Sequence, residues 1–152
     1  MSMNSSFIYG YGFSCTCDET SVRRFIKNHK EIFCQSDKEY MQYQELIDDV
    51  GNHLDLEEFF ADYECETNGL SGIGAVIANI MSRETGIRFL YAVADDECGT
   101  EASVVFEQGL PWNFNEVEQK LTEDRLEEIC KGYCKELHIN NAPDFLALEY
   151  YG

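Results

Sequence analysis

An almost uncharged stretch near the middle of the chain constrains the fold most strongly. No charged residue occurs between Glu66 and Arg83. A helix that is apolar on most sides is stable only when other elements cover it. We therefore expect a buried central helix over residues 72–83, capped by Ser71 and ended by Gly86. Its inward residues recur at spacings of three and four: Ile73, Val76, Ile77, Ile80 and Met81.

Residues 7–15 alternate in the manner of a β-strand. Aromatic side chains occupy one parity, and small residues such as Gly10 and Gly12 occupy the other. The small face would let a helix or another backbone approach closely. A phosphate-binding loop is the weaker interpretation, because the third glycine and the following helix are not at the required distance. Further strands are predicted at 87–94 and 102–107, joined by a polar hairpin loop over 95–101, and a short edge strand at 145–151.

Four more segments combine a capping residue with apolar residues at helical spacing. They are 20–29 with Asp18, 37–50 with Ser36, 56–64 with Asp55, and 122–137 with Thr122. The inward stripe of the 37–50 helix consists of Tyr40, Tyr43, Ile47 and Val50. Strands and helices are segregated along the chain, which is typical of an α+β fold. We expect one domain over residues 1–152, with a small, mostly antiparallel sheet of three or four strands and about five helices.

The charge balance narrows the classes of partner. The net charge is −18, from 29 Asp and Glu against 11 Lys and Arg. Direct binding of nucleic acid needs clustered cations for the phosphates, and anionic membranes need them for the headgroups. The strongly negative charge of this chain therefore disfavours direct binding to nucleic acid and to anionic membranes. No apolar run approaches the ~20 residues of a membrane span, and the first residues show no secretory signal, so we expect a cytoplasmic protein.

Seven cysteines occur, an odd number, and without export their thiols would stay reduced. We expect them to act as small apolar side chains, with no structural disulfide. A zinc site is conceivable if the first strand ends near the last helix. It is disfavoured because the chain has no Cys-x-x-Cys and Cys130 belongs to the apolar stripe of that helix. The residues concerned are Cys15, Cys17, Cys130, Cys134 and His138.

Two further catalytic or metal-binding patterns are weak. A cysteine nucleophile needs a histidine base beside it, and the sequence does not show whether His29, His53 or His138 lies beside a cysteine. No family-specific sequence surrounds any of the cysteines. His29 lies on an apolar stripe, which favours a hydrogen-bonded, half-buried histidine. The acidic segment 95–101 lacks the spacing of an EF-hand calcium loop. We expect no enzyme, no metal and no cofactor.

The acidic residues are unevenly distributed. Residues 1–38 hold five basic and four acidic residues, so the remainder carries a net charge of −19. From Glu39 to Ser82 there are ten acidic residues and no Lys or Arg. Carboxylates on two consecutive helices would form a row of negative charge, as a nucleic acid does. We predict that this row binds a basic protein through Asp48, Asp49, Asp55, Glu57, Glu58 and Asp62. The alternative is a solvated face that keeps the protein soluble.

Two stretches carry a resemblance to known proteins. Phe7-Ile-Tyr-Gly-Tyr-Gly-Phe13 and Arg83-Glu-Thr-Gly-Ile-Arg-Phe89 resemble uncharacterised small acidic proteins of bacterial phages and mobile elements. In size and charge the chain is also similar to anti-restriction and anti-CRISPR proteins, several of which mimic nucleic acid. The resemblance implies an inhibitor, and it assigns no functional residue.

Three functions remain open from the sequence. The leading hypothesis is a non-enzymatic protein that binds a basic partner, such as a nuclease of host defence, through a nucleic-acid-like acidic surface. The first alternative is an accessory or structural protein of a mobile element, in which acidity serves solubility. The second alternative is a small enzyme or zinc protein that uses Cys and His.

Overall fold

The computed structural model describes residues 5–48, 53–67, 70–96, 99–107 and 114–151. Within these ranges the chain forms seven helices and four strands, in accordance with the predicted α+β class. In chain order they are β1 (Ser5–Ser14), α1 (Glu19–Asn28), α2 (Lys30–Phe33), α3 (Asp37–Ile47), α4 (Leu56–Phe59), α5 (Ile73–Thr85), β2 (Phe89–Asp96), β3 (Gly99–Glu107), α6 (Glu116–Gln119), α7 (Glu123–Glu136) and β4 (Asp144–Tyr151).

The four strands form one antiparallel sheet in the order β1-β3-β2-β4, and the sheet closes on itself. Strand β4 pairs with β1 along its whole length and with β2 through Ala94 and Leu148. The antiparallel sheet was predicted, but the assignment of 145–151 as an edge strand is wrong, because β4 has a neighbour on both sides. The predicted loop over 95–101 is also too long, since β2 and β3 stay paired as far as Asp96 and Gly99.

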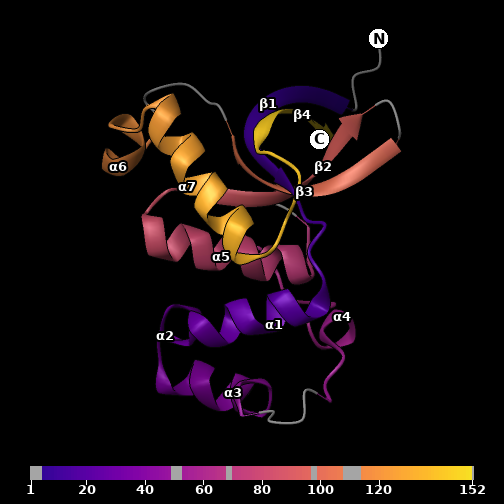
Figure 1. The fold of residues 1–152 in the computed structure, drawn as a ribbon, viewed down its shortest axis with the longest axis vertical. Helices are drawn as coiled ribbons and strands as arrows, with labels where there is room; N and C mark the ends of the chain where they lie inside the picture. Colours follow the sequence, from indigo (N-terminus) through magenta and orange to yellow (C-terminus); the bar gives the residue numbers. More distant parts are fainter. Residues whose placement is uncertain (1–4, 49–52, 68–69, 97–98, 108–113, 152) are drawn as a thin grey trace.

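The small face of β1 serves the close approach that its sequence predicts. A Cβ atom placed on Gly12 would lie 1.9 Å from the carbonyl oxygen of Val104 and 2.7 Å from the Cα of Val105. Only a glycine allows β3 to come this near. Strand β1 can therefore curl tightly around the sheet, as Figure 1 shows at the top of the molecule.

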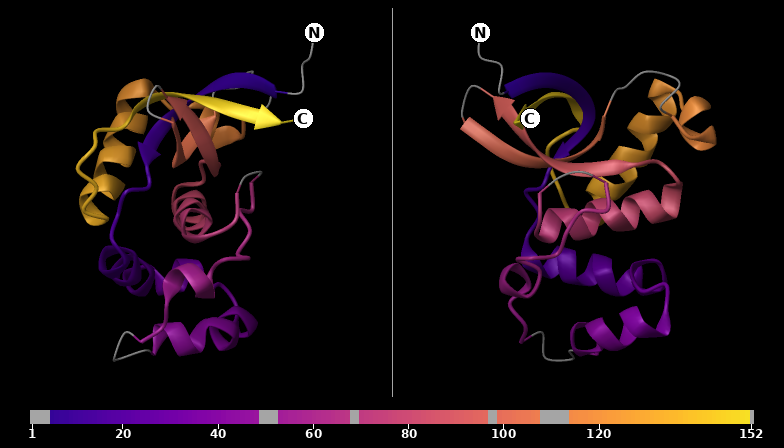
Figure 2. Two further views of the ribbon diagram at one scale, coloured as in Figure 1. Left: turned by 90° about the vertical axis from the view of Figure 1, so that its right-hand side faces the viewer. Right: turned by 180° about the vertical axis from the view of Figure 1, so that it is seen from behind.

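Helix α5 lies between the sheet and the layer formed by α1 and α2 (Figures 1 and 2). Every residue from Gly74 to Met81 is buried, as predicted for the central helix. The helix ends at Gly86 in the left-handed conformation, also as predicted. The N-cap of α5 is Gly72 (φ 122°) and not Ser71. Ser71 instead forms an isolated antiparallel β-bridge with Glu64. In the parts of the chain described, no helix is both long and apolar enough to cross a membrane.

The helices at 20–29, 37–50 and 122–137 are confirmed apart from their ends. Asp18 accepts a hydrogen bond from the Ser21 N–H at 2.7 Å, and Thr122 caps α7 in the same way. The helix predicted over 56–64 is wrong in length. It ends at Phe59, after one turn that Asp55 caps. The one-turn helices α2 and α6 were not predicted, because four residues are too few to show a helical period.

The predicted inward stripe of α3 is right only in part, since Ile47 is half-buried as predicted and Val50 lies outside the described residues. Tyr40 is 40% exposed, whereas Leu46 is fully buried and Tyr43 is half-buried. Tyr43 packs against Phe33, and Glu39, on the same side of the helix, reaches Arg83 of α5. These contacts set the rotation of the helix.

Candidate protein-binding surface

The described binding residues lie at the C-terminal end of α3, at the start of α4 and in the turn that follows α4. Asp48 is exposed at the C-terminal end of α3, and Asp62 is exposed after α4. Glu57 and Glu58 are exposed in the first turn of α4. Asp55 is exposed too, and its carboxylate accepts hydrogen bonds from the N–H groups of both glutamates at 3.1 and 3.4 Å. Asp49 lies outside the described residues. We call Asp48, Asp55, Glu57, Glu58 and Asp62 the acidic surface.

An aromatic cluster holds the two acidic elements together. Its members are in contact through ring centroids 4.7 to 6.3 Å apart: Phe33, Tyr43, Phe59, Phe60 and Tyr63. Such aromatic pairs stabilise packing beyond the area they bury. The carboxylates of α3 and α4 are therefore attached to one packed scaffold.

Arg83 pairs with the first and the last of the ten acidic residues between Glu39 and Ser82. Its guanidinium forms ion pairs with Glu39 and Glu66, and it donates hydrogen bonds to the carbonyl oxygens of Ile32 (3.2 Å) and Phe33 (2.8 Å). Two of the ten acidic residues are thus neutralised. In the described part of the chain, no ion pair involves the acidic surface. Arg83 was not singled out from the sequence, although it is the first basic residue after Lys38.

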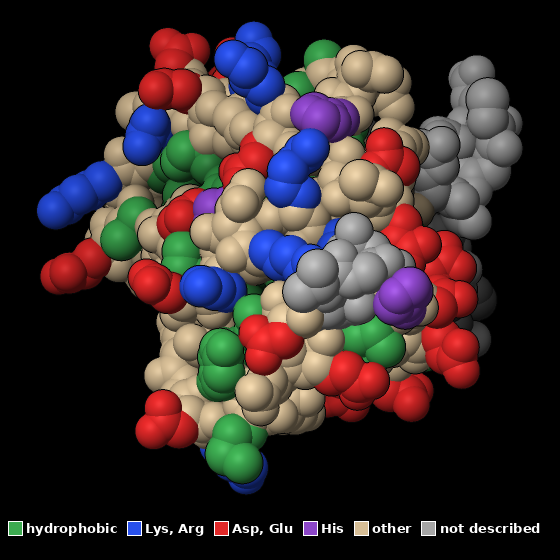
Figure 3. Space-filling model, turned by 60° about the horizontal axis from the view of Figure 1, so that its bottom comes forward, with side chains coloured by type: hydrophobic (Ala, Val, Ile, Leu, Met, Phe, Trp, Pro, Cys, Tyr) green, Lys and Arg blue, Asp and Glu red, His purple; other side chains and the backbone are tan. Residues whose placement is uncertain are grey.

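Figure 3 shows the lower face of the molecule, where α3 and α4 lie. Asp and Glu side chains gather on one side of the face, and Lys and Arg side chains lie near its centre. A groove of about 590 Å³ is lined by the basic residues Arg23, Arg24 and Lys27, by His53, and by the carboxylates of Glu19 and Asp55. The charge asymmetry of the sequence is therefore also an asymmetry in space, with the acidic surface beside the basic face of α1.

The four cysteines considered for zinc all lie in or against the hydrophobic core, whereas the histidine of that set makes polar contacts with α1. Cys15 and Cys17 follow β1, Cys130 and Cys134 lie on α7, and all four belong to or pack against one hydrophobic core cluster. His138 contacts the Ser21 hydroxyl at 3.2 Å and the Arg24 guanidinium. Among the described residues, no group of three or more Cys, His, Asp or Glu could hold a metal ion.

Burial sets the chemistry of these thiols. Burial raises the pKa of Cys130 to about 12 and that of Cys134 to about 11, and it raises the pKa values of Cys15 and Cys17 as well. A thiolate is the nucleophile and the metal ligand. At neutral pH these side chains are thiols, and they pack as apolar groups.

His29 is half-buried and hydrogen-bonded, as its position on an apolar stripe predicts. Its Nε2 lies 2.6 Å from a Glu136 oxygen, and its Nδ1 lies 3.3 Å from a Glu84 oxygen. The Tyr133 hydroxyl donates to the other oxygen of Glu84. Both ring nitrogens face carboxylates, so this histidine ties α1 to α5 and α7.

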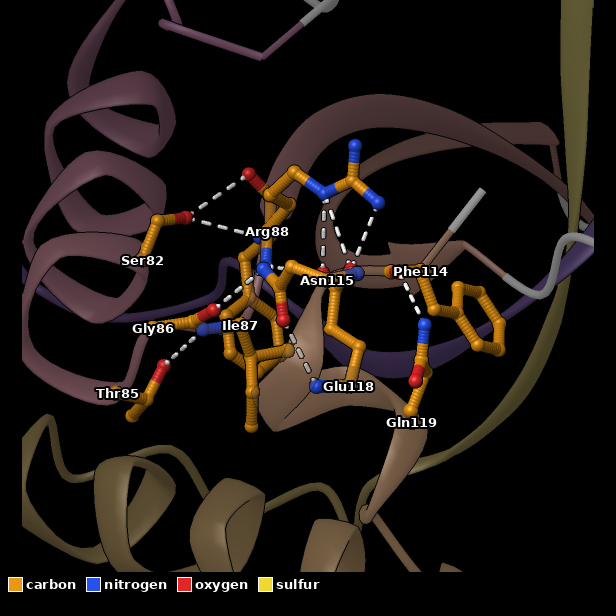
Figure 4. A network of polar contacts seen from close by, with 10 residues as sticks. Ser82, Thr85, Gly86, Ile87, Arg88, Phe114, Asn115, Glu118 and Gln119 are labelled. Carbon is orange, nitrogen blue, oxygen red and sulfur yellow. Dashed lines mark hydrogen bonds and ion pairs between the residues drawn. The ribbon is translucent and has the colours of Figure 1, made fainter. Parts of the chain in front are cut away.

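Glu118, a buried carboxylate on α6, was also not singled out from the sequence. The Glu118 side chain is fully buried, and it accepts hydrogen bonds from the Arg88 side chain at 2.7 Å and from the N–H groups of Arg88 and Asn115 (Figure 4). Asn115 in turn accepts from the Glu118 N–H, which completes a capping box. The signal in the sequence was Asn115 followed by Glu three residues later.

This arrangement presents exposed carboxylates on a packed scaffold, and it leaves Cys15, Cys17, Cys130 and Cys134 packed at the core and His29 hydrogen-bonded. The chemistry that it can offer a partner is electrostatic attraction and acceptance of hydrogen bonds from Lys and Arg side chains. Comparisons with protein families, with curated proteins and with solved structures found no match for this chain.

Proposed function

We propose that this protein is a non-enzymatic binding protein that docks its acidic surface on a basic partner protein. The observation that carries the proposal is that the exposed carboxylates at the end of α3 and around α4 have no ion-pair partner in the described residues, whereas Arg83 neutralises Glu39 and Glu66. Because the scaffold is packed, few side chains need to be ordered on association. Opposite potentials also speed encounter and select the partner.

The class of partner follows from the charge pattern. A row of negative charge complements the cationic channel with which nucleases and other nucleic-acid-handling proteins hold phosphates. The size and acidity of the chain, together with its resemblance to proteins of phages and mobile elements, support an inhibitor of a host defence protein. The acidic surface then takes the place of a nucleic acid.

The test compares two variants with equal loss of charge. In the surface variant, Asp48, Glu57, Glu58 and Asp62 become Asn or Gln, and Asp55 is kept because it caps α4. In the matched control, four other exposed carboxylates are neutralised: Glu31, Glu116, Glu123 and Asp124. Each protein is immobilised, and the proteins captured from host lysate are quantified at low and high salt.

We expect basic proteins that the wild type and the control retain at low salt and that the surface variant loses. Binding should also weaken as salt rises, since the screening length shortens to ~8 Å at physiological ionic strength. Equal capture by both variants would contradict the proposal and favour the first alternative, in which acidity serves solubility in an accessory protein. Stoichiometric zinc in the purified protein would instead favour the second alternative, a Cys/His enzyme or zinc protein.

A further inference from the structure

A groove of about 820 Å³ lies between the end of α5, α6 and α7, away from the acidic surface. Helix α6 forms one wall of the groove, and the buried Glu118 network fixes this wall to the start of β2 (Figure 4). Volumes of this size are typical of sites for small molecules. The walls are built from packed elements, so the groove is formed before any ligand arrives.

Gly132 is an exposed residue inside α7, and it lines this groove. A glycine inside a helix destabilises it relative to alanine. A Cβ atom at Gly132 would meet no other atom within 4 Å, so no close contact requires the glycine. Its φ is not positive either. Because Gly132 lines the groove, the space that a side chain would occupy at this position stays open, and we call this space the notch.

Carboxylates lie one helical turn before and after this notch. Glu128, Gly132 and Glu136 are spaced by four residues and so share one face of α7. At ~1.5 Å per residue, the two glutamates are about 12 Å apart along the helix axis. Glu136 is held in place by His29, and Glu84, which also lines the groove, is held by His29 and Tyr133.

The remaining lining combines apolar side chains with two cations. Val117 is 47% exposed, and Leu121 and Ile129 are half-buried beside it. Lys120 and Arg125 also line the groove, and Arg125 pairs with Glu128 at 3.2 Å. Both members of that pair are more than half exposed, so it is weak and can exchange partners. Four glutamates line the groove against these two cations.

We infer that this groove binds a linear aliphatic polyamine. Its ammonium groups pair with the carboxylates at the two ends of the Glu128–Gly132–Glu136 face. Its methylene chain lies in the notch at Gly132, against Leu121 and Ile129. The negative field of the whole molecule raises the local concentration of such cations. This site is independent of the function proposed for the acidic surface.

The test uses spermidine as the probe and isothermal titration calorimetry as the readout. Gly132→Leu fills the notch without a change of charge, and Gln42→Leu, at an exposed position of α3, is its matched control. We expect one saturable site in the wild type and in Gln42→Leu, and at least tenfold weaker binding in Gly132→Leu. Circular dichroism establishes that each variant is folded. Equal affinity of Gly132→Leu and the wild type would overturn the inference.

A second pair of variants keeps the test decisive if Gly132→Leu does not fold. Glu128→Gln removes a carboxylate from the groove, and Glu127→Gln removes the neighbouring one, which pairs with Lys131 outside the groove. If spermidine were attracted only by the overall negative charge, both variants would weaken its binding equally. We expect at least threefold weaker binding of spermidine in Glu128→Gln than in Glu127→Gln. Equal weakening, or equal displacement of spermidine by magnesium at the same charge concentration, would show nonspecific attraction and exclude the site.

Discussion

Replacing Glu118 by Gln tests the buried carboxylate that anchors α6. Four donors point at this carboxylate: the Arg88 N–H, Nε and Nη2, and the Asn115 N–H, at 2.7 to 3.1 Å. Glutamine keeps one acceptor oxygen and turns an NH₂ group toward the donors, so about two charge-assisted hydrogen bonds are lost. At about 1.5–3 kcal/mol each, the expected loss of unfolding free energy is about 3–6 kcal/mol.

Thermal unfolding followed by circular dichroism measures this loss. For a chain of this size, each kcal/mol shifts Tm by about 2–4 °C, so Glu118→Gln should lower Tm by about 10 °C. Glu116→Gln is the control, since this residue is exposed on the same helix, and its effect should stay within about 0.5 kcal/mol. A loss in Glu118→Gln as small as in the control would refute the view that the network holds α6.

The same network makes stability depend on pH. Burial disfavours the charged form of Glu118, but hydrogen bonds from Arg88 and from two backbone N–H groups outweigh burial and hold its pKa below the ordinary 4.5. The folded state thus binds this proton less readily than the unfolded state. Its stabilisation is present above about pH 4.5 and is lost as pH falls through the folded pKa. In Glu118→Gln this part of the acid sensitivity should vanish.

Two other perturbations follow from the described contacts. Arg83→Met keeps the aliphatic stem but removes the hydrogen-bond donors to Ile32, Phe33, Glu39 and Glu66. Chemical denaturation should therefore show a loss of about 2–4 kcal/mol in unfolding free energy. An unchanged unfolding free energy would contradict the role of Arg83 as an anchor. The core thiols of Cys130 and Cys134 should react slowly with Ellman's reagent at about pH 8, because burial raises their pKa values to about 12 and about 11. Unfolding should release seven reactive thiols, and rapid reaction of these two thiols in the native protein would argue against this packing.

Local patterns in the sequence predicted most of the elements. The uncharged stretch before Arg83 predicted the buried α5, because an apolar helix has no other stable place. The alternation over 7–15 predicted β1, and the capping residues Asp18 and Thr122 marked the starts of α1 and α7. The exposure of the carboxylates around Asp55 also followed from their spacing relative to the apolar residues. These features depend on residues a few positions apart.

Tertiary contacts decided the rest. β4 gains its second neighbour only when the sheet closes, which places Ala94 opposite Leu148. The neutralisation of Glu39 and Glu66 by Arg83, and the burial of Glu118 beneath Arg88, join residues 17 to 44 positions apart. Hydrophobic periodicity specifies which face of an element is buried, but not which other element covers it. That choice depends on packing and charge pairing over the whole chain, and it is what leaves some carboxylates paired and the acidic surface exposed.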